Sequence, residues 1–426
     1  MYKKILPKQS IKTTVTIPGD KSISHRSIIL GAIAQGLTEI EGFLMGEDCL
    51  ATISCFQKLG IQIEIKDEKV YVYGKGLHGL SAPIETLDVG NSGTTLRLLS
   101  GILSAQPFTC QITGDASIQK RPMDRIAIPL RQMGGRLEGD STEKLLAPFT
   151  IIGQPLKGID YILPVASAQV KSAILLASLY AQGETTVTEP QSTRDHTEIM
   201  LNYMGANIKK TGNKIICHPV SELFGKKIIV PGDISSAAYF IVAGCICPDS
   251  ELLLKNVGMN QTRTGILDVL LRMGADIEMQ NIREYQGEKV SDILVKSSKL
   301  SSTVIGEGDI PRLIDEIPVL AVAACFAEGE TIIKDAEELK VKESNRIKTV
   351  VTELKKFGAN IRETDDGMVI RGGVPLMGCT VESYHDHRIA MSMAVAAVCA
   401  IGETVINESE CVDISFPGFY DVFAKL

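Results

Sequence analysis

The chain has 426 residues, and at roughly 150 residues per domain this length predicts two or three domains. With 44% hydrophobic and 22% charged residues, the composition is that of a globular protein and excludes a disordered, collagen-like or disulfide-dense chain. The net charge of −7, the 5% aromatic content and the lack of Trp argue against a nucleic-acid-binding protein.

The cysteines and the apolar stretches indicate where the protein works. Ten scattered cysteines form no Cys-x-x-Cys pair, which is typical of buried thiols in a reducing compartment. Residues Met1 to Pro7 lack the apolar core of a signal peptide. The longest apolar stretch, Ile389 to Ile401, is too short to span a bilayer. We therefore expect a cytoplasmic protein without membrane attachment.

Repeated landmarks organise the chain. Pro18-Gly19-Asp20 returns as Pro231-Gly232-Asp233, and each copy precedes an apolar helical run. A helix end followed by Gly and then a strand recurs, with Gly as the left-handed cap, at Gly60, Gly134, Gly205, Gly274 and Gly358. Six α/β units are predicted to begin near Gly19, Gly90, Val165, Gly232, Asp315 and His385.

The Pro-Gly-Asp pair predicts two domains of three units each. One domain covers residues 20–230, and the other combines 1–19 with 232–426, with a hinge near 18–20 and 230–232. The sixth unit is truncated, and the first 18 residues, strand-like from Ile11 to Ile17, can complete it. A cleft between two domains is a common ligand site.

Cations stand at helix starts, where the helix dipole disfavours them. Lys21 and Arg26 open the first unit, and Arg388 opens the sixth within His385-Asp386-His387-Arg388. A single case would be a solvated basic surface, but recurrence at corresponding helix starts favours a shared anionic ligand.

Further polar motifs begin or precede other helices. Gly90 to Thr95 is a Gly-rich turn that lacks the Gly-Lys-Ser/Thr ending of a P-loop, and its Gly93 lets a ligand approach the backbone. Arg121 lies in a loop before Pro122. Ser167-Ala168-Gln169-Val170-Lys171 begins a third helix. The stretch Lys340 to Arg346 opens a helix and is either functional or a surface salt-bridge cluster.

Together these motifs resemble the enolpyruvyl transferases and, among them, the EPSP synthase family. The resemblance covers essentially the whole chain. Its most specific segments are Pro18 to Arg26 and Gly90 to Thr95. Arg121-Pro122, Lys342 to Arg346 and Asp386 to Arg388 add to it. The fold it implies is α/β: an inside-out barrel of two similar domains, each of three βαβαββ repeats, with the active site in the interdomain cleft.

The resemblance implies transfer of the enolpyruvyl group of phosphoenolpyruvate to the 5-hydroxyl of shikimate 3-phosphate, with release of phosphate and without metal or cofactor. The implied shikimate 3-phosphate ligands are Lys21, Ser22, Arg26, Ser167, Gln169, Ser192, Asp315 and Lys342. The implied phosphoenolpyruvate ligands are Lys21, Gly93, Arg121, Gln169, Arg346 and Arg388. Family members are usually monomers, so we expect a monomer.

The same resemblance implies catalytic roles. Asp315 resembles the base for the acceptor hydroxyl, and Glu343 resembles the acid and base at C3 of the enolpyruvyl group. Lys21 is expected either to protonate the departing phosphate or to neutralise its charge. Gly93 implies inhibition by glyphosate at the phosphoenolpyruvate site. One departure is Ile414, where some members carry a lysine ligand.

Three alternatives remain at this point. The sister enzyme that uses UDP-N-acetylglucosamine usually carries Cys where this chain has Ala116, and Lys-Asn where it has Lys21-Ser22. A non-catalytic relative would be expected to lack some of the charged site residues. A metal site at His385-Asp386-His387 is disfavoured because residues two apart diverge on a helix.

Overall fold

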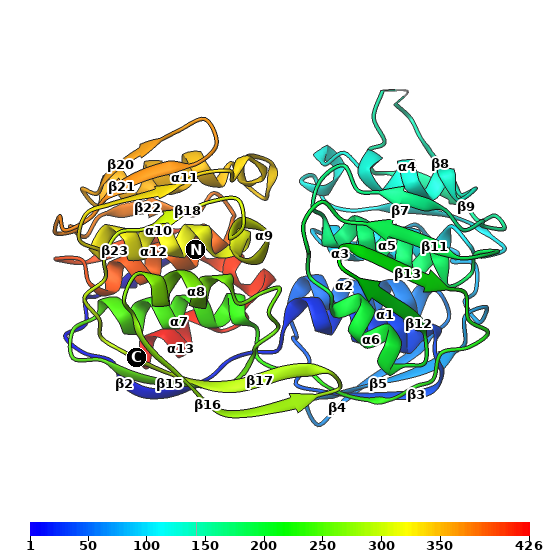
Figure 1. The fold of residues 1–426 in the computed structure, drawn as a ribbon, viewed down its shortest axis with the longest axis horizontal. Coiled ribbons are helices and arrows are strands. Elements are labelled where there is room, and N and C mark those ends of the chain that lie inside the picture. Colours follow the sequence, from blue (N-terminus) through cyan, green and yellow to red (C-terminus); the bar gives the residue numbers. More distant parts are fainter. Residues whose placement is uncertain (142) are drawn as a thin grey trace. The chain divides into compact units, whose positions relative to one another are not determined.

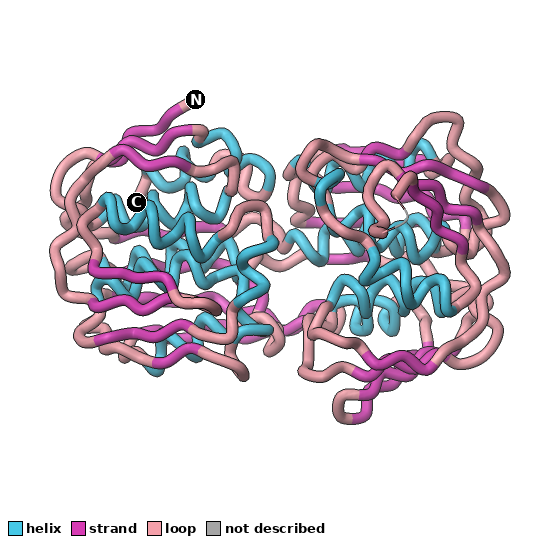
Figure 2. The backbone as a smooth tube through the Cα atoms, turned by 90° about the horizontal axis from the view of Figure 1, so that it is seen from above, coloured by secondary structure: helices cyan, strands magenta, loops and turns pink. Residues whose placement is uncertain are grey.

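The computed structural model describes residues 1–141 and 143–426. The chain divides into two compact units: unit 1 is Met1–Pro18, Pro231–Glu284 and Glu288–Leu426, and unit 2 is Gly19–Val230 and Tyr285–Gly287. Within each unit the helices lie inside and the strands lie around them (Figures 1 and 2). Each unit therefore has its own hydrophobic core, built mainly by helices.

Unit 2 contains three repeats of the order βαβαββ. The first is β14 (Lys227–Ile229), α1 (Lys21–Ile33), β3 (Gln35–Glu41), α2 (Glu47–Lys58), β4 (Gln62–Lys66) and β5 (Lys69–Lys75). The second is β6 (Leu87–Asp88), α3 (Gly93–Leu103), β7 (Thr109–Thr113), the 3₁₀ helix η1 (Ile118–Lys120), α4 (Asp124–Gln132), β8 (Arg136–Gly139) and β9 (Phe149–Ile152). The third is β10 (Asp160–Ile162), α5 (Ala168–Ser178), β11 (Thr185–Thr188), α6 (His196–Tyr203), β12 (Asn207–Thr211) and β13 (Lys214–His218).

Unit 1 repeats the same order. Its first repeat is β2 (Lys12–Thr16), α7 (Ile234–Ile246), β15 (Glu251–Gly258), α8 (Gly265–Arg272), β16 (Asp276–Tyr285) and β17 (Glu288–Lys296). The next is β18 (Val304–Ile305), α9 (Ile310–Leu313), η2 (Ile314–Glu316), α10 (Ile317–Phe326), β19 (Glu330–Ile333), η3 (Glu337–Val341), α11 (Arg346–Lys356), β20 (Asn360–Glu363) and β21 (Met368–Arg371). The last is β22 (Thr380–Glu382), α12 (His387–Val398), β23 (Thr404–Asn407), η4 (Ser409–Ile414), α13 (Phe419–Ala424) and β1 (Tyr2–Ile5).

Each repeat builds one small mixed sheet. In the sheet β6-β7-β9-β8, β6 is parallel to β7, and β9 is antiparallel to both β7 and β8. Four other sheets follow the same plan, and the sixth, β22-β23-β1, has three strands. The five glycines predicted to end helices all have φ between +87° and +108°, so the left-handed caps that lead into the strands are confirmed.

The first helix of each repeat is buried on nearly all sides. Helix α10 is almost entirely apolar, and a helix that is apolar all round belongs in a core. Helices α3 and α5 pack closely at Gly101, because a Cβ there would lie 2.3 Å from the carbonyl oxygen of Ala173. Five of these first helices begin at a polar capping residue, namely Asp20, Ser92, Ser167, Asp233 and Asp386.

The N-terminal segment corrects one sequence-based prediction. Strand β1 completes the truncated sixth repeat, pairing antiparallel with β23 from Tyr2↔Asn407 to Ile5↔Thr404. Strand β2 was expected to join that sheet as well, but it is parallel to β15 in the fourth repeat. The reason is that β2 comes just before Pro18, where the chain passes from unit 1 to unit 2. The carbonyl of Pro18 accepts a hydrogen bond from the N–H of Asp233 (2.9 Å), just before the first helix of the fourth repeat. Alternation predicts a strand but not its partner.

Candidate functional site

Helix α1 begins with two of the predicted cationic residues. The side chain of Asp20 caps the helix by accepting from the N–H of Ile23 (2.9 Å). Lys21 forms an ion pair with Asp48 of α2. The buried guanidinium of Arg26 donates to Thr197 Oγ1 (2.7 Å), Ser172 Oγ (2.9 Å) and the Ser22 carbonyl (2.9 Å). The cations at this helix start are thus held at fixed positions by neighbouring side chains.

His25 lies between these two cations in the sequence and is fully buried. Burial, reinforced by Lys21 and Arg26, lowers the pKa of His25 well below its usual value, so its imidazole is neutral. Its Nδ1 pairs with Thr52 Oγ1 (2.7 Å), which pairs with Thr95 Oγ1 (2.6 Å). Thr95 in turn donates to Ser92 Oγ (2.7 Å), the N-cap of α3. This chain of polar groups connects the starts of α1 and α3.

The start of α3 brings together three residues predicted for phosphoenolpyruvate. Gly93 is close to two guanidinium groups, since a Cβ there would lie 2.8 Å from Arg97 Nη1 and 3.6 Å from Arg121 Nη1. Arg97 Nη1 donates to Gln169 Oε1 (2.5 Å), and Gln169 Nε2 donates to Thr94 Oγ1 (3.0 Å). The backbone at Gly93 therefore borders a patch of positive charge that a small anion can approach.

Ser167 and Ser192, predicted for shikimate 3-phosphate, belong to the third repeat. Ser167 is the N-cap of α5 and accepts from the N–H of Val170 (3.4 Å). Ser192 is exposed in the loop between β11 and α6, and its hydroxyl accepts from Lys210 Nζ (2.9 Å). We call Lys21, Ser22, Arg26, Gly93, Arg121, Ser167 and Gln169 the unit 2 cluster.

In unit 1, Arg346 at the start of α11 is the centre of the predicted residues. Its guanidinium is buried and donates to Asp386 Oδ2 (2.9 Å), Asp315 Oδ1 (3.2 Å) and Glu343 Oε2 (2.6 Å). Burial lowers the pKa of Arg346, but Asp386 and Glu343 outweigh burial, and its pKa is raised overall. Arg346 therefore brings both predicted catalytic carboxylates to one guanidinium.

Arg388 at the start of α12 adds a second cation. It donates to the Asp315 carbonyl (3.1 Å), and its Nη2 lies 3.7 Å from Asp315 Oδ2. Burial lowers the pKa of Arg388, but Asp315 and other acidic groups raise it well above its usual value. We call Asp315, Lys342, Glu343, Arg346 and Arg388 the unit 1 cluster. Lys342 precedes Glu343 and is half-buried.

Asp386 is the residue of this region that sequence reasoning left without a role. It is fully buried, caps α12 by accepting from the N–H of Arg388 (3.0 Å), and accepts from Ser344 Oγ (2.9 Å). Burial raises the pKa of Asp386, but Arg346 outweighs it and the pKa is lowered overall. The sequence signal was its N-cap position beside the conspicuous His385, His387 and Arg388.

Two other acidic partners were missed for a similar reason. Asp48 pairs with Lys21 from a different helix, and Glu316 accepts from Ser235 at the start of α7. Neither contact follows from local spacing, because each joins elements that are distant in sequence. Both carboxylates lie near a helix-start cation, since Asp48 pairs with Lys21 and Glu316 Oε1 lies 3.9 Å from Arg388 Nη1.

The residues considered above for a metal site, His385 and Asp386, have other partners. Asp386 caps α12 and binds Arg346, while His385 Nε2 lies 3.0 Å from Glu408 Oε1. Among residues 1–141 and 143–426, no group of three or more His, Cys, Asp or Glu side chains is placed to hold a metal ion. In the same part of the chain, no helix is long and apolar enough to cross a membrane.

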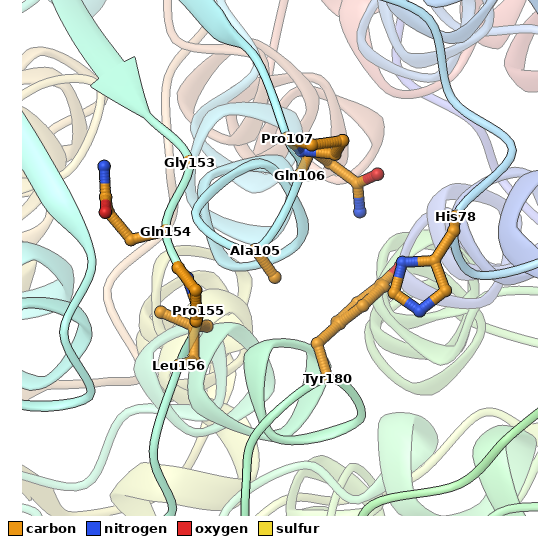
Figure 3. Close-up of a pocket in the computed structure, with 9 residues that line it drawn as sticks. All are labelled: His78, Ala105, Gln106, Pro107, Gly153, Gln154, Pro155, Leu156 and Tyr180. Carbon is orange, nitrogen blue, oxygen red and sulfur yellow. The ribbon is translucent and has the colours of Figure 1, made fainter.

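A pocket of about 290 Å³ lies elsewhere in unit 2. Figure 3 shows His78 beside Tyr180, whose rings meet edge to face with centroids 5.6 Å apart. Gln106 and Tyr180 follow the C-terminal ends of α3 and α5. None of the residues predicted for substrate lines this pocket, and two of them, Gly93 and Gln169, lie at the opposite, N-terminal ends of α3 and α5.

Comparisons with known proteins identify the family. Residues 5–423 match the family model described as EPSP synthase (3-phosphoshikimate 1-carboxyvinyltransferase). The chain belongs to the EPSP synthase family. A relative from Thermoanaerobacter sp. (strain X514), named 3-phosphoshikimate 1-carboxyvinyltransferase, is 58% identical over 419 residues, 98% of each chain. These matches confirm the predicted family and the predicted type of enzyme. They support this prediction over the two alternatives, the sister enzyme and a non-catalytic relative.

Solved structures support the same assignment. EPSP synthase from Acinetobacter baumannii matches with a TM-score of 0.90 and 48% identity, covering 100% of this chain and 97% of that one. The enolpyruvyl transferase NikO from Streptomyces tendae matches with a TM-score of 0.82 and 18% identity, covering 99% and 96%. The second likeness concerns the fold alone. The predicted α/β fold of βαβαββ repeats is confirmed.

Proposed function

We propose that the chain transfers the enolpyruvyl group of phosphoenolpyruvate to the 5-hydroxyl of shikimate 3-phosphate and releases phosphate. The observation that carries the proposal is the family match over residues 5–423. The two clusters support it, since each gathers cations or carboxylates at helix N-termini. The test is phosphate release on mixing the protein with both substrates, with UDP-N-acetylglucosamine as the alternative acceptor. Release with that acceptor but not with shikimate 3-phosphate would overturn the proposal.

The unit 2 cluster is assigned, together with Ser192, to anion binding. Lys21, Ser22, Arg26, Ser167, Gln169 and Ser192 bind shikimate 3-phosphate, and Gly93, Arg121 and Gln169 border the phosphoenolpyruvate. Support comes from Arg26, whose buried guanidinium is held in place by hydrogen bonds to two hydroxyls and a carbonyl. A guanidinium fixed in this way loses little further freedom on binding an anion.

The unit 1 cluster is assigned to proton transfer. Asp315 takes the proton of the acceptor hydroxyl as that oxygen attacks C2 of phosphoenolpyruvate. Glu343 delivers a proton to C3 and removes one from C3 when phosphate leaves, so it must be protonated by the time the chemical step begins. Lys21 neutralises the charge on the departing phosphate.

Arg346 and Arg388 are assigned to the phosphoenolpyruvate anion. Arg346 also donates to Glu343 Oε2 at 2.6 Å, a contact suited to the ionised carboxylate. A substrate anion that takes over Arg346 donors would release Glu343 from this ion pair and permit its protonation. The binding step would thereby prepare the acid for the chemical step.

The remaining expectations are part of the same proposal. The protein is a cytoplasmic monomer that works without cofactor and binds no nucleic acid. Because ligands for each substrate come from both units, substrates should favour a state in which the two clusters come together. Small-angle scattering with and without shikimate 3-phosphate tests this. An unchanged radius of gyration would count against ligand-driven closure.

A further inference from the structure

A buried lysine in unit 2 has no role in the mechanism described above. Lys171 belongs to the first turns of α5 and is completely buried. Its ammonium group lies 3.0 Å from Glu189 Oε1 and 2.6 Å from Glu198 Oε1, and it donates to the Thr193 carbonyl (3.4 Å). The ammonium group thus lies among two carboxyl groups and one backbone carbonyl.

The partners of Lys171 come from both ends of the loop that joins β11 to α6. Glu189 directly follows β11, Thr193 lies within the loop, and Glu198 belongs to the first turn of α6. Glu189 Oε1 also accepts from the N–H of Thr193 (3.1 Å) and from its hydroxyl. The loop of residues 189–195 is therefore fastened to α5 through one buried ammonium group.

This network leads to Ser192 in the same loop. Lys210 Nζ lies 3.8 Å from the second oxygen of Glu189 and donates to Ser192 Oγ (2.9 Å). Glu189 thus has one cation at each oxygen, with Lys171 inside and Lys210 at the surface. The set balances two carboxylates against two lysines.

The network also leads to Arg26. The residues next to Lys171 and Glu198, namely Ser172 and Thr197, pair through their hydroxyls (2.7 Å). Both hydroxyls also accept from Arg26. Two side-chain contacts therefore join α5 to α6: the ion pair Lys171–Glu198 and the hydrogen bond between Ser172 and Thr197. A shift of α6 relative to α5 would move the acceptors of Arg26.

We propose that Lys171 is a positioning residue for the shikimate 3-phosphate side of the site, acting on Ser192 through Glu189 and Lys210 and on Arg26 through α6. Lys171 itself contacts no substrate because it is completely buried. The proposal rests on the proposed function, which assigns Ser192 and Arg26 to that substrate. The phosphoenolpyruvate side is supported differently, through Arg97, Gln169 and Thr94. Loss of Lys171 should therefore affect one substrate more than the other.

The test is Lys171→Met, with the Kd for shikimate 3-phosphate measured by calorimetry and the KM of each substrate measured by phosphate release. We expect the Kd and KM for shikimate 3-phosphate to rise about tenfold, the size of a typical coupling between contacting residues. The KM for phosphoenolpyruvate should change less than twofold. An equal rise for both substrates, or no rise, would overturn the proposal. Wild-type protein inactive with shikimate 3-phosphate would instead overturn the proposed function.

Lys171→Met leaves two buried carboxyl groups without their cation and can therefore impair folding. A second pair of variants tests the proposal without changing a buried residue. Lys210→Met changes a partly exposed residue and should raise the KM for shikimate 3-phosphate about threefold, as expected for one lost hydrogen bond. Lys209→Met is the matched control, because successive residues of β12 point to opposite faces. It should match wild type.

Coupling gives the sharpest readout. If Lys171 acts partly through Ser192, then Lys171→Met should raise the KM for shikimate 3-phosphate less in a Ser192→Ala background than in wild type. The core variant Ile215→Val, in β13 of the same sheet, reports general loosening of the repeat and should leave both KM values unchanged. Strict additivity of the Lys171 and Ser192 effects would remove Ser192 from the proposed path.

Discussion

The two units share one architecture, but the buried arginine near the start of a helix has different described acceptors in each unit. In unit 2, Arg26 donates to two hydroxyls and a backbone carbonyl. In unit 1, Arg346 donates to three carboxylates. Three carboxylates around Arg346 bring acid–base groups together in unit 1, whereas the described acceptors of Arg26 are two hydroxyls and a carbonyl. We propose that unit 1 carries out the proton transfer and that both units bind anions, with Arg26 in unit 2 and with Arg346 and Arg388 in unit 1.

The largest effect should come from Glu343→Gln in unit 1. The amide keeps the shape of the side chain but cannot deliver and remove a proton, so kcat should fall by about 10²–10⁴-fold. Binding of shikimate 3-phosphate should change little. Steady-state turnover and calorimetry separate the two quantities.

The control for this variant is Glu337→Gln, an exposed residue at the start of η3, which should keep wild-type turnover. If Glu343→Gln retains most of the wild-type turnover, then Glu343 is not the acid and base at C3. In that case the assignment of proton transfer to the unit 1 cluster loses one of its two carboxylates.

Asp386→Asn tests the carboxylate balance of unit 1 directly. Asn can still cap α12, but it leaves Arg346 without one buried counter-charge. Breaking a buried ion pair from one side costs about 3–5 kcal/mol of the free energy of unfolding. Chemical denaturation should show this loss, whereas Asp309→Asn, which removes an ion pair of a largely exposed Arg272, should cost under about 1 kcal/mol.

The same residue predicts an acid dependence. Because the pKa of Asp386 is lowered in the folded protein, its contribution is fully present above its unfolded pKa. The contribution is lost as the pH falls from about 4 through the folded pKa. Wild type should therefore lose stability in this range more steeply than Asp386→Asn. Parallel acid profiles for the two proteins would remove Asp386 as the source.

Arg26→Met measures the other side of the comparison. It removes the donor of three hydrogen bonds, whose described acceptors in Ser172, Thr197 and Ser22 are neutral. Leaving these acceptors without a donor should lower the free energy of unfolding by about 1–3 kcal/mol. The loss should be smaller than for Asp386→Asn, while the Kd for shikimate 3-phosphate should rise. Arg136→Met, on an exposed strand position of the same unit, should change neither quantity. Equal stability losses for Arg26→Met and Asp386→Asn would contradict the comparison.

Sequence patterns predicted the repeats well, because their signals are local. Gly60 and the other helix-end glycines mark left-handed caps, and the apolar runs after Gly19 and Gly232 mark buried helices. The pairing of β2 with β15 was not predictable, since a short alternating strand carries no information about its partner. The family resemblance named Arg346 and Glu343, but the acid partners Asp48 and Asp386 became visible only through contacts between separate elements.

Gly93→Ala should give the smallest effect and sharpen the anion-binding assignment of unit 2. The new Cβ would lie 2.8 Å from Arg97 Nη1, the atom that donates to Gln169, so the end of this flexible side chain must shift. Glyphosate is longer than phosphoenolpyruvate, so the added methyl should obstruct the inhibitor more than the substrate. One methyl group discriminates by about 1–3 kcal/mol. We expect wild type to be inhibited by glyphosate, and Gly93→Ala to resist it with a modest rise in the KM for phosphoenolpyruvate.

Gly308→Ala, where a Cβ meets open space, is the control and should behave as wild type. Equal inhibition of wild type and Gly93→Ala would show that Gly93 does not border the inhibitor, and would move the phosphoenolpyruvate side of the site away from the start of α3.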